Sequence, residues 1–207
     1  MKFAAIRCTD NSAPQGVLDY CLDNLYRVIP KTIDVFHSVK PANMPRCQLT
    51  LYKQLLSAAE STDADFVFIT EHDVIYDASH FTLIPKRDDV FYYNFNVFVL
   101  TERGYAVTGR VYLSQLCAPR KLLIQSIQER ILFIKTSGEN IPFYEPAYKD
   151  PFTKFEKHVF ISQQCNVDIR HGSNITLEQR NPIKPPFYTQ IGKYKHYKDL
   201  RREMELE

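Results

Sequence analysis

The chain has 207 residues, of which 44% are hydrophobic and 24% charged, so it is long enough for one sizeable core. The formal net charge of +2 is too small to indicate a nucleic-acid partner by itself. The five cysteines are scattered and form no CxxC pair, which disfavours a disulfide framework or a cysteine-based zinc site and favours a reduced, cytoplasmic setting. We expect no signal peptide, because the N-terminal apolar stretch is too brief, and no segment approaches the ~20 apolar residues of a membrane span.

The first 80 residues alternate between strand and helix patterns. Strands are predicted at 3–6, 33–37 and 66–69, where short runs are rich in β-branched and aromatic residues. Helices are predicted at 17–28 and 48–60, where apolar residues recur at helical spacing. This alternation predicts an α/β fold with a mostly parallel, Rossmann-type central sheet flanked by helices.

The pattern changes after residue 80. The expected strands are 90–93, 97–100, 104–107 and 167–169. A long helix is predicted at 119–134 and a short one at 155–162, on either side of a proline-containing, loop-rich stretch. We expect one domain over 1–207, made of a nucleotide-donor half (1–80), an acceptor half (81–180) and a basic C-terminal tail (181–207).

The strand at 66–69 runs into the polar cluster Glu71-His72-Asp73. Ligands of open α/β sheets bind at the carboxyl ends of the strands. Two carboxylates separated by one residue at such an edge can hold a hard divalent cation that also takes phosphate oxygens. The alternative is that these polar side chains only cap the strand at the surface.

This order of elements resembles the glycosyltransferases of the GT-A fold over most of residues 3–176. Glu71-His72-Asp73 looks like a variant of their Asp-x-Asp motif, with Glu in the first position. The resemblance implies that Asp73 coordinates a metal directly, and that Glu71 reaches the metal through water or touches the donor's ribose.

His171 follows the strand at 167–169, where the superfamily's late metal-binding histidine falls; its alternative is a surface histidine beside a glycine turn. Mn²⁺ or Mg²⁺ suits carboxylate and diphosphate oxygens. We expect His72 to point to the opposite face of the strand and to be structural, because side chains alternate along strands.

Further candidates for binding the nucleotide-sugar donor are Thr9, Asp10, Asn11, Arg46, Gln48 and Lys193. The first three follow the first strand and offer hydrogen bonds to a base and ribose, or they form an ordinary turn. Arg46 and Gln48 stand at the start of the helix at 48–60, whose N-terminus favours a diphosphate. Lys193, or Lys195 in the same basic run, can close over the phosphates or remain a solvated charge.

An inverting transfer needs a carboxylate that takes the proton of the acceptor hydroxyl. Glu145 is the favoured catalytic candidate and Asp150 the second, with Glu156 also in this loop-rich region. An exposed loop charge is the alternative for each of them.

These observations predict a small, metal-dependent, inverting glycosyltransferase that moves a sugar from a nucleotide-sugar, taken as a UDP-sugar, to a hydroxyl acceptor. The acceptor is a glycan or a hydroxymethylated pyrimidine in phage DNA, for which the basic run at 193–198 would supply phosphate contacts and base stacking. The expected setting is the cytoplasm of a bacterium, or of the host if the enzyme is phage-encoded. A nucleotidyltransferase and a non-catalytic nucleotide- or sugar-binding module remain the alternatives.

Overall fold

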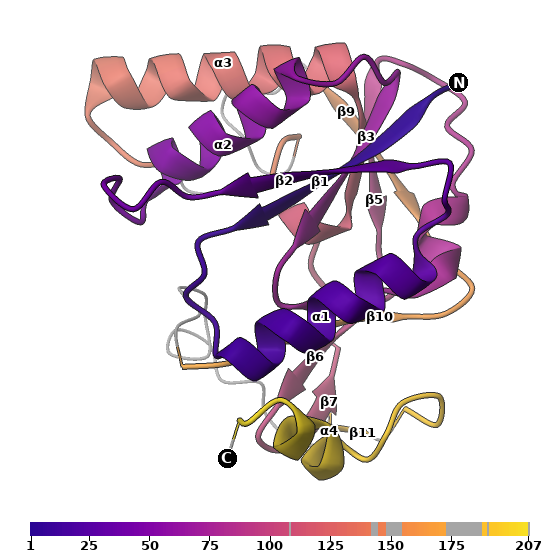
Figure 1. Ribbon diagram of the computed structural model, residues 1–207. Coiled ribbons are helices and arrows are strands. Elements are labelled where there is room, and N and C mark those ends of the chain that lie inside the picture. The colour runs from indigo at the N-terminus through magenta and orange to yellow at the C-terminus, as the bar shows by residue number, and fades with distance from the viewer. Residues whose placement is uncertain (108, 142–144, 148–154, 173–187, 190, 207) are drawn as a thin grey trace.

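The computed structural model describes residues 1–107, 109–141, 145–147, 155–172, 188–189 and 191–206. These residues form two β-sheets with helices packed against them (Figure 1). In the described part of the chain, no helix combines the length and the apolar character needed to cross a membrane.

The larger sheet has the strand order β2-β1-β3-β8-β5-β9. Its strands are β1 (Phe3–Thr9), β2 (Asp34–Val39), β3 (Phe66–Glu71), β5 (Val90–Asn94), β8 (Leu116–Pro119) and β9 (Glu156–Phe160). Strands β2 and β3 both pair parallel to β1, and β9 pairs parallel to β5. Strand β8 lies antiparallel between β3 and β5 and joins the two parallel groups.

Helices cover both faces of this sheet, as its parallel strands require. Helices α2 (Gln48–Glu60) and α3 (Arg120–Ser137) pack on one face, and α1 (Gln15–Val28) lies on the other (Figure 1). The alternation of side chains along β1 supplies both cores: Ile6 packs on the side of α2 and Ala5 on the side of α1. Helix α3 ends where Gly138 adopts the left-handed conformation, with φ of 73°.

The smaller sheet has the order β11-β7-β6-β10-β4. Its strands are β4 (Val74–Ile75), β6 (Val97–Thr101), β7 (Gly104–Ala106), β10 (Asn166–Ile169) and β11 (Tyr188–Thr189). Strand β10 pairs parallel to β6 and antiparallel to β4. The C-terminal helix α4 (Tyr197–Glu203) and the first half of α1 cover this sheet through Val17, Cys21 and Leu200. Two 3₁₀ turns, η1 (Ala78–Thr82) and η2 (Leu113–Gln115), complete the set.

The predicted α/β class, with a central sheet flanked by helices, is confirmed. The short helix expected at 155–162 is wrong, because this segment forms the edge strand β9. Over a segment this short, aromatic and β-branched residues are compatible with either a helix or a strand. Pairing with β5 makes this segment a strand. Strand β8 and helix α4 were not expected at all.

Candidate functional site

A cavity of about 190 Å³ opens at the carboxyl ends of β1 and β3, beside the first turn of α2 and the end of β10. Most of the residues that line it have polar or ionisable side chains. The residues that line it include Thr9, Asp10, Arg46, Glu71, His72, Asp73, Tyr112, Glu145, Asp168 and Arg170. This is the edge at which open α/β sheets bind ligands.

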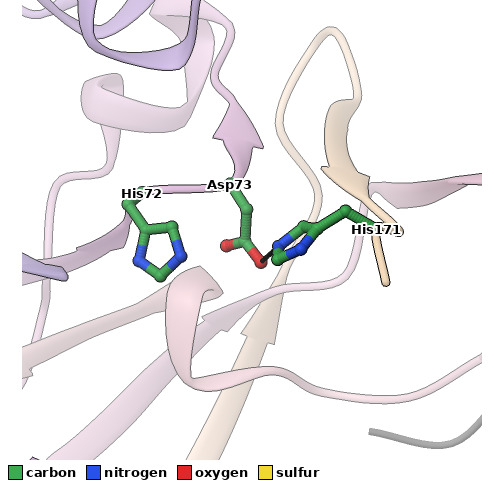
Figure 2. Close-up of side chains that lie close together, drawn as sticks. All are labelled: His72, Asp73 and His171. Atoms are coloured by element: carbon green, nitrogen blue, oxygen red, sulfur yellow. Dashed lines mark hydrogen bonds and ion pairs between the residues drawn. The ribbon is translucent and has the colours of Figure 1, made fainter. Parts of the chain in front are cut away.

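Three potential metal ligands meet beside this cavity. His72, Asp73 and His171 each offer a donor atom, and these atoms lie within 4.8 Å of one another. Figure 2 shows the Asp73 carboxylate between the two imidazole rings. His171 Nε2 lies 3.4 Å from Asp73 Oδ2, and the His171 side chain is only 1% exposed.

The turn after β3 places two of these ligands. Strand β3 ends at Glu71 and β4 begins at Val74, so His72 and Asp73 lie in a turn where strand alternation no longer holds. The expectation that His72 points away from the site is therefore wrong. Its ring faces the cavity, with Nε2 3.8 Å from Asp10 Oδ1.

The third ligand comes from β10. Asp168 pairs with Val74 in the antiparallel ladder, and the Ile169 amide donates to the Asp73 carbonyl oxygen at 2.8 Å. These backbone contacts hold the end of β10 against the turn after β3. His171 follows two residues later and meets the Asp73 side chain.

The local charges favour an ionised Asp73. Burial acts to raise the pKa of this carboxyl, but the hydrogen bond from His171 and the electrostatic attraction of His72, His171 and Arg170 outweigh it and lower the pKa. The neighbouring Glu71 shows the opposite behaviour. Burial, followed by the negative charges of Asp73 and Asp168, raises its pKa well above the ordinary value.

The donor set fits a transition metal. Two imidazole nitrogens and one carboxylate suit Mn²⁺, Fe²⁺ or Zn²⁺ better than Mg²⁺, which prefers oxygen ligands. Glu71, a predicted ligand, lines the cavity but is not a member of this donor group. The structure brings together the predicted ligands Asp73 and His171, and it adds His72.

Four of the predicted donor-binding residues line the cavity: Thr9, Asp10, Arg46 and Glu71. Asp10 accepts a hydrogen bond from the Ser12 amide at 3.0 Å and forms an ion pair with Arg46. Burial opposes ionisation of Asp10, but the Ser12 hydrogen bonds and the charge of Arg46 outweigh it and lower the pKa. Asn11 adopts the left-handed conformation with φ of 55°, and its side chain accepts from the Thr9 hydroxyl at 3.0 Å. These contacts make the loop a side-chain-stabilised turn, and within it Thr9 and Asp10 line the cavity.

Two other donor candidates are engaged elsewhere. The Gln48 amide bonds both backbone groups of Ile141, donating to the carbonyl at 2.7 Å and accepting from the N–H at 2.8 Å. Lys193 forms an ion pair with Asp77. Neither Gln48 nor Lys193 lines the cavity, so the structure does not bring them to the other donor-binding candidates.

Glu145 lines the cavity, and buried polar side chains hold its segment in place. Arg130 donates to the Glu145 carbonyl oxygen at 3.1 Å, and the Tyr93 hydroxyl donates to that of Pro146 at 2.7 Å. Arg130 and Tyr93 are both completely buried. Asp150 lies outside the described residues. Glu156 lies on β9, where it pairs with Arg87 and does not line the cavity.

Two cavity residues, one on β10 and one directly after it, were missed from the sequence. Asp168 and Arg170 lie 3.4 Å apart at their charged atoms, and the Arg170 guanidinium carbon is 5.9 Å from the centre of the Tyr112 ring. The available signal was a carboxylate inside an apolar strand, with an arginine directly after the strand.

Comparisons with known proteins bear on the fold. A scan against models of protein families finds no match, and a search of curated protein sequences finds none either. Among solved structures, a glycosyltransferase involved in glycosylation of the major capsid of the virus PBCV-1 matches at a TM-score of 0.55 and 6% identity, covering 81% of this chain and 93% of that one. The chain therefore has a glycosyltransferase fold.

Two weaker likenesses carry no further argument. The apo glycosyltransferase GlyE of Streptococcus pneumoniae matches at a TM-score of 0.46 and 11% identity, over 76% of this chain and 45% of that one. A nucleotidyl transferase from Methanothermobacter matches at 0.38 and 9% identity, over 66% and 83%. The match at a TM-score of 0.55 is the one that confirms the resemblance to the GT-A glycosyltransferases, at the level of the fold.

Proposed function

We propose that this protein is a metal-dependent glycosyltransferase that transfers a sugar from a nucleotide-sugar to a hydroxyl acceptor with inversion. One observation carries the proposal. The donor atoms of His72, Asp73 and His171 converge beside a polar cavity at the carboxyl ends of β1 and β3, in a chain with a glycosyltransferase fold.

On the donor side, His72, Asp73 and His171 would hold Mn²⁺, which when bound neutralises charge that develops on a departing diphosphate. Arg170 adds a guanidinium from the cavity wall, a group whose geometry matches phosphate oxygens. The loop at Thr9 and Asp10 offers oxygen acceptors to a base and ribose. A uridine nucleotide is the proposed donor, with Glu71 as a further contact in the cavity.

On the acceptor side, Glu145 is the proposed general base. Glu145 lines the same cavity as His72 and Asp73, and its segment is held by Arg130 and Tyr93. A base must be held at a fixed position to accept a proton from the attacking hydroxyl as the glycosidic bond to the diphosphate breaks. These buried contacts provide that support.

The contacts of the tail favour a glycan hydroxyl over a DNA base as acceptor. Lys193 pairs with Asp77 and Lys195 with Glu203, so two of the basic residues expected to bind DNA phosphates already have carboxylate partners. We further propose that residues 1–207 act as one catalytic domain in a reducing cytoplasm, in keeping with five free cysteine thiols.

The test is thermal unfolding in the presence of UDP, GDP, ADP and CDP, and of UDP-glucose and UDP-galactose, each with and without Mn²⁺. A ligand at about 100 times its dissociation constant adds roughly 2.7 kcal/mol to the free energy of unfolding. We expect one nucleotide class to stabilise the protein in the presence of Mn²⁺, and Asp73→Ala to abolish the effect. Asp89→Ala is the matched control, because Asp89 is exposed and pairs with Arg87 outside the cavity. Absence of stabilisation by every nucleotide would overturn the proposal.

Product analysis separates the remaining alternatives. A glycosyltransferase releases a nucleoside diphosphate from the nucleotide-sugar, even when water slowly replaces the acceptor. A nucleotidyltransferase instead joins a nucleoside triphosphate to a sugar phosphate and releases pyrophosphate from the triphosphate. A binding module would give nucleotide stabilisation but neither product.

A further inference from the structure

Strand β10 and the two residues after it carry much of the proposed site, yet the strand is only four residues long. Asp168 and Arg170 line the cavity, and His171 belongs to the metal-ligand cluster. Its ladder neighbours are β6 and the two-residue strand β4. The position of His171 relative to Asp73 therefore depends on what fixes the two ends of β10.

The C-terminal segment 193–206 contacts both ends of this strand. At the start of β10, the Tyr194 hydroxyl donates to the carbonyl oxygen of Cys165 at 2.6 Å. At the other end, Arg201 Nη1 donates to the carbonyl oxygen of Arg170 at 3.4 Å, one residue before His171. Lys193 adds an ion pair with Asp77, whose backbone N–H donates to Asn166 Oδ1 at 2.9 Å.

Helix α4 is itself held in place by buried packing against α1. Leu200 and Met204 are 1% and 0% exposed and pack with Val17 and Cys21 of α1. The approach is so close that a Cβ placed on Gly16 would lie 2.8 Å from the Met204 carbonyl oxygen, a distance that forces a shift. Arg201 also donates from Nη2 to the carbonyl oxygen of Leu206 at 2.8 Å, which links the helix end to the contact with β10.

We propose that segment 193–206 is a supporting part of the metal centre: by holding both ends of β10, it fixes His171 against Asp73, and Arg201 is a positioning residue for this ligand. The proposal rests on the metal site of the proposed function. Tyr194, which was expected to stack on bases, here donates its hydroxyl hydrogen bond to the Cys165 carbonyl at the start of β10. Loss of contacts behind a metal ligand typically weakens metal affinity about 10–100-fold.

The experiment measures Mn²⁺ binding to the full chain by electron paramagnetic resonance of free Mn²⁺, at a temperature where every variant is folded. Gly16→Ala displaces α4 from α1, and Arg201→Ala removes the contact with Arg170. We expect each to weaken Mn²⁺ binding about 10-fold, with partial recovery in Arg201→Lys.

Two matched controls separate positioning from a general effect of the tail. Arg202 is the neighbouring arginine, 66% exposed and paired with Asp199, so Arg202→Ala should leave affinity unchanged. A Cβ on Gly192 would meet none of the described atoms within 4 Å, so Gly192→Ala should behave like wild type. Equal Mn²⁺ affinity in wild type, Gly16→Ala and Arg201→Ala would overturn the proposal.

Hydrogen exchange of the metal-free protein keeps this test independent of the proposed function. If wild type binds no Mn²⁺, the metal site fails, but the support of β10 is still measurable. Faster exchange of the backbone amides at 166–172 in Gly16→Ala than in Gly192→Ala then supports the positioning role. Equal exchange in the two variants overturns it.

Discussion

The two sheets hold the proposed metal site in different ways. His72 and Asp73 follow β3, a strand flanked by parallel and antiparallel partners and covered by helices on both faces. His171 follows β10, which lies in a sheet with two strands of only two residues and depends on α1 and segment 193–206 for its cover. The larger sheet is stabilised by its own extensive core, and the smaller one by contacts between distant parts of the chain.

This difference indicates that fold stability and site geometry are separable here. Damage to the core under α2 and α3 should lower the stability of the whole protein while leaving folded molecules able to bind metal. Damage under the smaller sheet should act on the site before it acts on the whole. The predictions below test this contrast from the largest expected effect to the smallest.

The first prediction compares two buried leucines, one in each core. Leu55 and Leu200 are 0% and 1% exposed. Leu55→Ala should lower the free energy of unfolding by about 3 kcal/mol, because it leaves a cavity in the main core, with Mn²⁺ affinity unchanged in the folded protein. Leu200→Ala should cost less in urea unfolding but weaken Mn²⁺ binding about 10-fold. Equal effects of the two changes on both measurements would contradict the contrast.

The second prediction removes one metal ligand from each side. His72→Ala and His171→Ala should each lower Mn²⁺ affinity by roughly 100-fold, about 2.7 kcal/mol, as measured by calorimetry. The control is His158→Ala, because His158 lies on the edge strand β9 beside Glu156. If only His171→Ala reduced affinity, His72 would be structural after all.

The third prediction concerns His80, which contacts a strand of each sheet. His80 is completely buried, and its Nδ1 lies 3.1 Å from the side-chain nitrogens of Asn94 on β5 and Asn166 on β10. Burial lowers the pKa of His80 to about 3. Below the unfolded-state pKa of about 6.5, His80 is protonated in the unfolded chain but stays neutral in the folded protein. The free energy of unfolding therefore falls as the pH falls from 6.5 towards 3.

This contribution amounts to about 1.4 kcal/mol per pH unit, or roughly 2 kcal/mol between pH 6.5 and pH 5. Urea unfolding of wild type and His80→Gln at the two pH values isolates it, because other groups titrate in both proteins. A pH dependence of the same steepness in His80→Gln would rule out His80 as the source.

The fourth prediction tests support of the proposed base on the larger sheet. Tyr93→Phe removes the hydroxyl that donates to the Pro146 carbonyl and should cost about 1 kcal/mol of stability. It should also slow Mn²⁺-dependent hydrolysis of the nucleotide-sugar several-fold without changing nucleotide affinity. Tyr92→Phe is the matched control, because its hydroxyl donates to the Arg87 carbonyl at 3.0 Å, away from the cavity. Equal rates in the two variants would contradict the role assigned to Tyr93.

Much of the larger sheet was predictable because its signals are local. The amphipathic pattern at 48–60 predicts α2 with the bounds that the structure has, and the apolar run at 66–69 predicts β3. Strand β8 was not predictable in this way. Its four apolar residues could equally begin the following helix, and only pairing with β3 and β5 on either side makes them a strand.

The site was predictable only in part, for the same reason. Asp73 and His171 stand at strand ends that the pattern identifies, and the structure brings them together. The direction of His72 depends on where β3 stops, which pairing between β4 and β10 determines. Gln48 stands at a helix start, but the backbone of Ile141 engages its amide, and no local pattern encodes that partner. Contacts of this kind are set by tertiary packing rather than by periodicity.

The close approach of Gly16 to Met204 has a consequence for the order in which the protein assembles. Contacts between residues far apart along the chain form slowly, because a large loop must close before they contribute any stability. The parallel strands β1 to β3 can form from the first 71 residues. Packing of α4 against α1, in contrast, brings together segments near the two ends of the described chain. We therefore expect Mn²⁺ binding during refolding to lag behind the main rise in helical signal, so that metal uptake reports the completion of folding.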